Sequence, residues 1–142
     1  MRFRRISRGE EGQALVEFAL VVPVLLLLLL GIVEFGLLLY NQQVITNASR
    51  EGARYGIVMR TPRRSVEEIK AVVDFYAGTR LITFGDSVPQ TDVVPDPTAG
   101  STFGDDLSVG VSFHYDFLVL PSFLAFLVGG QELRATTTMK YE

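Results

Sequence analysis

An uninterrupted apolar segment near the N-terminus limits what this chain can fold into. From Phe18 to Val33 the sequence has no charged residue, and apolar residues resume from Phe35 to Tyr40. A helix from Ala14 to Tyr40 would be about 40 Å long, whereas the hydrocarbon core of a bilayer is about 30 Å thick. The segment therefore predicts a membrane-spanning helix rather than the buried helix of a soluble domain.

The charges on either side of this segment predict its orientation. The first eight residues are rich in arginine and contain no acidic residue, so the positive-inside rule places them in the cytoplasm. Arg50 and Arg54 lie well beyond the apolar end, where arginine has a weaker tendency to keep a segment in the cytoplasm. We predict a single span in the inner (cytoplasmic) membrane, with the N-terminus inside and the C-terminal domain outside. The leader arginines are Arg2, Arg4, Arg5 and Arg8.

The start of the apolar segment carries a candidate processing site. A secretory signal peptide is disfavoured, because the apolar stretch is too long and no small-residue cleavage site follows Leu30. Instead, Gly12 stands at the foot of the predicted helix and is followed, after four residues, by Glu17 and Phe18. This arrangement resembles a prepilin peptidase site. The resemblance implies cleavage between Gly12 and Gln13 by that peptidase, which would make Gln13 the new N-terminus.

Glu17 lies about one turn inside the predicted span. A charged side chain there costs several kcal/mol unless it is paired or reaches water. The resemblance to pilins implies an assembly role for Glu17 and the adjacent Phe18, in which the carboxylate meets the positively charged N-terminus of a neighbouring subunit. Alternatively, Glu17 sits at the headgroup boundary with its carboxylate in water.

Two further residues mark the predicted helix. Glu34 lies about 26 Å beyond Glu17 along the helix axis, near the opposite membrane surface. We predict that Glu34 is a solvated interfacial carboxylate, and the alternative is a packing contact with another subunit. Pro23 removes one backbone hydrogen bond within the span and predicts a local kink or a melted turn.

The helical pattern continues outside the membrane as far as Gly56. Ala48, Gly52 and Gly56 place a small residue at every fourth position, which would let another helix or the downstream domain approach the backbone closely. Alternatively, the two glycines fray and end the helix.

Three motifs in this region together resemble the TadE-like family. They are Gln13 to Leu20 with the Pro23 break, Glu34 to Gly36, and Asn47 to Tyr55. Members of that family are pseudopilins or minor pilin-like proteins of the tight adherence system, which assembles thin Flp pili. The resemblance implies a role in pilus assembly, with other pilins or pseudopilins and the inner-membrane assembly platform of that system as partners.

The division of the chain follows from these features. Residues 1–12 are predicted to be a basic prepilin-type leader, and residues 13–56 the transmembrane helix with its juxtamembrane extension. Residues 57–142 are predicted to form a small extracytoplasmic domain. The fold class expected is α+β, in which the long helix precedes a short helix and an antiparallel sheet, as in pilins.

Within the predicted domain, Ser65 and Glu68 form a capping box at the start of a short helix that ends at Gly78. Apolar and polar residues alternate in the segments 107–117 and 131–142, which predicts two antiparallel strands. Of the remaining segments, 80–84 is predicted as a strand and 85–106 as a long loop. Residues 118–128 are predicted as a short helix that covers the sheet. Alternatively, residues 118–128 dip into the membrane surface.

The composition gives no sign of chemistry. There is no cysteine, and the formal net charge of -3 gives no reason to expect nucleic-acid binding. The one histidine, His114, lies two residues from Asp116, and we predict a solvent-facing pair rather than a catalytic or metal site. We therefore expect no enzymatic activity, no metal and no cofactor. A second functional hypothesis is an uncleaved single-span protein whose outer domain binds a ligand or surface through the 85–106 loop.

Overall fold

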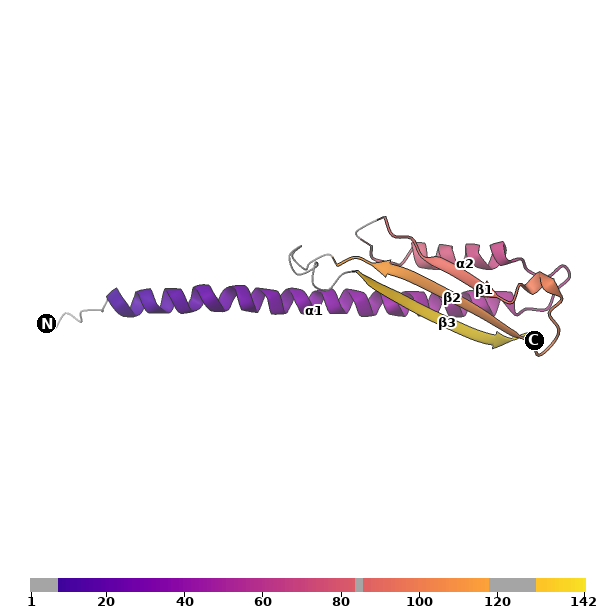
Figure 1. The fold of residues 1–142 in the computed structure, drawn as a ribbon, viewed down its shortest axis with the longest axis horizontal. Helices are drawn as coiled ribbons and strands as arrows, with labels where there is room; N and C mark the ends of the chain where they lie inside the picture. The colour runs from indigo at the N-terminus through magenta and orange to yellow at the C-terminus, as the bar shows by residue number, and fades with distance from the viewer. Residues whose placement is uncertain (1–7, 84–85, 118–129) are drawn as a thin grey trace.

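The computed structural model describes residues 8–83, 86–117 and 130–142, and it consists of one long helix with a small domain packed against its C-terminal half (Figure 1). The fold is α+β, as the sequence predicted. In chain order the elements are helix α1 (Arg8–Gly56), helix α2 (Val66–Gly78), strand β1 (Gln90–Val94), 3₁₀ helix η1 (Pro97–Ala99), strand β2 (Asp106–Tyr115) and strand β3 (Gln131–Lys140).

Helix α1 has 49 residues and begins at Arg8, inside the segment predicted to be the leader. It remains α-helical through Pro23, so the expected melted turn is not present. The proline removes only one of the many hydrogen bonds of the helix, and the leucines that follow it have high helix propensity. The predicted continuation of the helix to Gly56 is confirmed.

The two halves of α1 have different surroundings. From Gly12 to Val33 every residue is exposed except Val22, which is half-buried. From Glu34 onward, one face of the helix is buried under the domain. That face contributes Ile45, Ala48 and Ala53 to the hydrophobic core. The apolar first half therefore lies bare, while the second half is an integral part of the domain.

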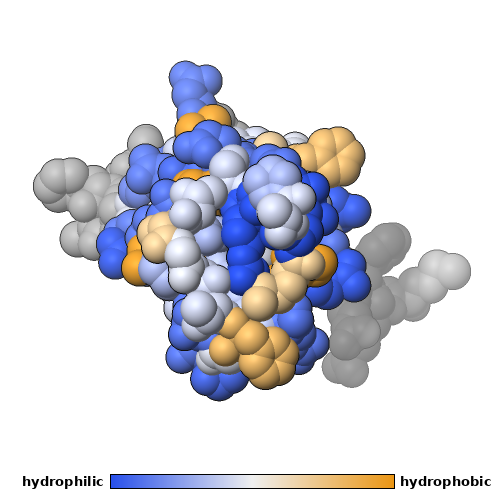
Figure 2. Space-filling model, turned by 90° about the vertical axis from the view of Figure 1, so that its right-hand side faces the viewer, coloured by the Kyte–Doolittle hydropathy of each residue, from blue (hydrophilic) through white to orange (hydrophobic). Residues whose placement is uncertain are grey.

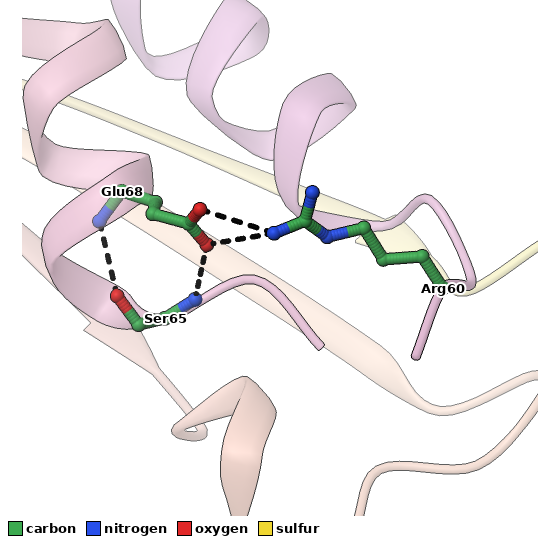
Figure 3. A network of polar contacts seen from close by, with 3 residues as sticks. All are labelled: Arg60, Ser65 and Glu68. Carbon is green, nitrogen blue, oxygen red and sulfur yellow. Dashed lines mark hydrogen bonds and ion pairs between the residues drawn. The ribbon is translucent and has the colours of Figure 1, made fainter. Parts of the chain in front are cut away.

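Helix α2 begins with the predicted capping box (Figure 3). The Glu68 amide donates to the Ser65 hydroxyl at 3.2 Å, and the Ser65 amide donates to the Glu68 carboxylate at 2.9 Å. Arg60 adds an exposed ion pair with Glu68 at 3.0 Å. Ile69, Val73 and Ala77 form the buried face of α2, and the helix begins after Ser65 and ends at Gly78, as predicted.

The sheet has the order β1-β2-β3, and both pairs of strands are antiparallel. Leu107, Val109, Val111, Phe113 and Tyr115 of β2 are buried, and the residues between them face the open side of the sheet. Helix α1 packs against β2 and β3, and α2 contacts β1. The predicted pairing of 107–117 with 131–142 is confirmed, and each strand ends two residues earlier than predicted.

The strand predicted at 80–84 is wrong for residues 80–83, and residue 84 lies outside the described residues. The Leu81 amide donates to the Ala77 carbonyl at 2.8 Å, which continues the end of α2. Both backbone groups of Ile82 bond to the Asn41 side chain, at 2.7 and 2.9 Å, and are not available for a sheet. A helix side chain has thus taken the hydrogen bonds that a strand would need.

The segment predicted as a long loop, 85–106, contains β1 and η1, so this prediction is also wrong. The prolines at 89 and 95, which suggested a loop, instead flank an edge strand of 5 residues. Proline is tolerated beside an edge strand because only one side of that strand is paired. The predicted helix 118–128 lies outside the described residues. The alternative prediction, that this segment dips into the membrane surface, concerns the same residues.

Candidate functional site

The predicted cleavage site, Gly12-Gln13, lies within the early turns of α1. A side chain added at Gly12 would meet nothing within 4 Å, so the bond has open surroundings. Gly12 is helical, so exposure of its peptide bond in an extended form requires local unwinding of α1. Glycine lowers the cost of this unwinding, since it is a poor helix former.

Glu17 and Phe18 are both exposed on α1, and the exposed fraction of Phe18 is 68%. Within the part of the chain that the structure describes, no hydrogen bond or ion pair involves the Glu17 carboxylate. The fold therefore presents an acidic and an aromatic side chain outward, at the foot of a bare apolar helix.

Glu34 is 2% exposed, so the prediction that its carboxylate is solvated is wrong. The Tyr115 hydroxyl donates a hydrogen bond of 2.6 Å to Oε1 of Glu34. Burial of the phenol, together with this hydrogen bond, raises the pKa of Tyr115 above its usual range. The sequence did not reveal this burial because Tyr115 lies 81 residues away in the chain.

The two carboxylates of the apolar segment thus differ in what satisfies them. Glu34 is satisfied by the chain's own domain, whereas Glu17 is exposed. An exposed carboxylate at the lipid boundary costs several kcal/mol unless water or a cation meets it.

Ala48, Gly52 and Gly56 are buried, and in this structure the chain's own domain approaches them. A Cβ atom added at Gly52 would lie 2.5 Å from Cγ2 of Val73 on α2. One added at Gly56, the last residue of α1, would lie 2.5 Å from Cδ2 of Leu107 on β2. The small residues therefore allow α2 and β2 to reach the backbone of α1.

Three polar residues on the same face of α1 were missed by the sequence analysis. Asn41 is fully buried and bonds to the backbone of Ile82. Ser49 is also fully buried, and its hydroxyl lies 3.0 Å from the Val109 carbonyl. The side-chain amide of Gln42 donates a hydrogen bond of 3.0 Å to the backbone carbonyl of Arg134. The signal available in the sequence was their position among small and apolar residues on the packing face.

The described residues of the domain show little that resembles a catalytic centre. His114 and Asp116 are exposed and 3.4 Å apart, so the predicted solvent-facing pair is confirmed. In the described ranges, no group of three or more His, Asp or Glu side chains is placed to hold a metal ion. The open face of the sheet has a shallow hollow over Gly110, lined by polar residues that include Asp92, Arg134 and Thr136.

Helix α1 is long and apolar enough to cross a membrane, judged by its length and composition. In comparisons with known proteins, residues 12–54 match the model of the TadE-like protein family. No curated protein and no solved structure matches the chain significantly. That family is one of tight adherence pilus systems and is not one of enzymes. From Gly12 to Arg54, therefore, this chain is similar to the TadE-like family, which is the family that its motifs predicted.

Proposed function

We propose that this protein is a minor pilin or pseudopilin that acts in the assembly of a tight adherence pilus. The observation that carries the proposal is the exposed Glu17 carboxylate at the foot of a bare apolar helix, in the segment that matches the TadE-like family. A bare helix with one unsatisfied carboxylate favours side-by-side packing with another helix that brings a positive charge.

Cleavage after Gly12 by a prepilin peptidase would supply that positive charge. The cut frees the amine of Gln13 at the foot of the same helix, one turn from Glu17. In a bundle of such helices, the amine of one subunit can pair with Glu17 of the next, and Phe18 packs beside the pair. The carboxylate then acts as an assembly contact rather than as a destabilising charge.

The partners in this proposal are the prepilin peptidase, other pilins or pseudopilins and the inner-membrane assembly platform of the tight adherence system. The protein sits in the inner membrane with its N-terminus in the cytoplasm and its domain outside, from where it can enter the pilus. The arginine-rich leader supports this orientation.

Replacing Glu17 tests the assembly role. We expect Glu17→Gln to insert into the membrane normally and to fail in restoring pili to a strain that lacks the protein. The control is Val16→Ala, at a neighbouring residue that is 62% exposed, and it should restore pili. Normal piliation with Glu17→Gln would contradict the role given to the carboxylate.

The intact mass of the membrane-extracted protein tests cleavage. We expect the mass to correspond to residues 13–142, and Gly12→Val to retain the full chain. The control Gly9→Val changes another leader glycine and should leave cleavage intact. A full-length wild-type protein favours the alternative, an uncleaved single-span protein with a binding domain. The segment 85–106, through which that domain was expected to bind, contains β1 and η1.

A further inference from the structure

The bare part of α1, from Gly12 to Val33, passes directly into the part buried by the domain, which begins at Glu34. Val33 is 53% exposed, and the next residue, Glu34, is 2% exposed. There is no linker between the two parts, and the helix is continuous across the junction. The height of the domain above a membrane is therefore fixed by the depth of α1.

The length of the bare part leaves little room between the membrane and the domain. Seventeen residue steps separate Glu17 from Glu34, which is about 26 Å along the helix axis, while the hydrocarbon core is about 30 Å thick. Any tilt of the helix shortens the vertical distance further. With Glu17 at the inner boundary, Glu34 comes no higher than the outer boundary of the hydrocarbon core.

The end of the domain nearest to this boundary is formed where β2 ends and β3 begins. Tyr115 reaches Glu34 through its hydroxyl, and Gln131 is the register partner of Tyr115. Phe117 packs edge-on against Tyr115, with ring centroids 5.7 Å apart. Asp116 and Gln131 are exposed at the same end.

The other end of the domain lies far from this boundary. Strand β3 runs from Gln131, on the side of the bare helix, to Lys140 near the C-terminus (Figure 1). The two residues are about 30 Å apart at about 3.3 Å per residue. The surface at the far end is mostly hydrophilic with separate apolar groups (Figure 2).

We infer that the membrane-proximal end, whose surface carries Asp116, Phe117 and Gln131, rests among the lipid headgroups of the outer leaflet. The inference rests on the membrane anchoring of α1 that is part of the proposed function. The contact is imposed by the continuous helix. It does not depend on electrostatic attraction between this end and the headgroups, since this end carries both His114 and Asp116. The membrane surface is thus a partner of the domain as long as α1 stays in the bilayer.

The absence of cysteine allows a direct test with single-cysteine variants of the full chain. Gln131→Cys and Lys140→Cys place an environment-sensitive fluorophore at exposed positions at the two ends of one strand. Leu25→Cys, at a residue that is 50% exposed within the bare helix, reports insertion. Each variant is reconstituted in phosphatidylcholine vesicles, with nitroxide-labelled lipids as quenchers, and circular dichroism checks its fold.

We expect headgroup nitroxides to quench the label at Gln131 and to leave the label at Lys140 unchanged, while acyl-chain nitroxides quench the label at Leu25. Quenching at Leu25 with no quenching at Gln131 overturns the inference and leaves the membrane anchor intact. Equal quenching at Gln131 and Lys140 also overturns it, because the domain then lies on its side. Absence of quenching at all three positions overturns the inference together with the anchor.

Discussion

The Tyr115 hydroxyl donates a 2.6 Å hydrogen bond to the Glu34 carboxylate and so joins the end of β2 to the residue where α1 enters the domain. Asn41 and Ser49 continue this series of polar contacts along the same helix. These hydrogen bonds, like the close approach of Val73 to Gly52, are satisfied in one register only. They therefore fix the position of the domain on α1.

Removing the Tyr115 hydroxyl should destabilise the domain. We expect Tyr115→Phe to lower the free energy of unfolding by about 1–3 kcal/mol, because a buried carboxylate loses a hydrogen-bond donor. Tyr40→Phe is the control, since Tyr40 is 45% exposed, and it should change stability by less than about 0.5 kcal/mol. Denaturant unfolding in detergent micelles measures both, and equal stability of the two variants would contradict the role of this bond.

Alkaline pH should weaken the domain through the same residue. In the unfolded chain Tyr115 loses its proton near its usual pKa of about 10, while in the folded domain its pKa is raised by burial and by the hydrogen bond to Glu34. The unfolded state thus binds fewer protons above about pH 10, so stability is fully present below that pH and falls as the pH rises further.

Unfolding measured between about pH 9 and about pH 11 should show this loss in the wild-type protein and in Tyr40→Phe. The loss should be smaller in Tyr115→Phe, which has no group to titrate at this position. An identical pH dependence in all three proteins would show that Tyr115 is not its source.

Adding a methyl group at Gly52 should disturb the packing between α1 and α2. A Cβ atom there would lie 2.5 Å from Val73, whose branched side chain has little freedom to move. We expect Gly52→Ala to destabilise the domain by about 1–3 kcal/mol through overpacking, which exceeds its gain of about 1 kcal/mol in helix propensity.

Gly36→Ala is the matched control for this change. A Cβ atom at Gly36 would meet nothing within 4 Å, so the substitution should leave stability unchanged or raise it slightly. Thermal unfolding followed by circular dichroism compares the two variants. If Gly52→Ala proves as stable as Gly36→Ala, close packing at Gly52 is not required.

Asn41 should be needed to hold the segment after α2. Replacing it with leucine leaves the amide and carbonyl of Ile82 without their partners at 2.9 and 2.7 Å, so we expect a loss of about 2–4 kcal/mol. Gln43→Ala, at an exposed residue on the same helix, should cost less than about 0.5 kcal/mol. Hydrogen exchange at the Ile82 amide should also become faster in Asn41→Leu, and unchanged protection would contradict the proposed contact.

Local signals in the sequence predicted most of the secondary structure. The capping box at Ser65 predicted the start of α2, and strict alternation predicted β2 and β3. These signals depend on residues close together in the chain, and they are readable without the fold. Strand β1 was missed because its 5 residues lie between prolines, and a short edge strand is stabilised mainly by the neighbour with which it pairs.

The sequence by itself determined that a long apolar helix leads into an α+β domain and that residues 12–54 resemble the TadE-like family, because periodicity and motif spacing lie along the chain. Only the tertiary structure decided which carboxylate is satisfied. Glu34 and Glu17 are equivalent as charges in an apolar stretch, and Glu34 is buried because the fold brings Tyr115 to it. Burial and hydrogen bonding depend on residues distant in sequence, and the sequence alone therefore could not separate the internal contact from the exposed one.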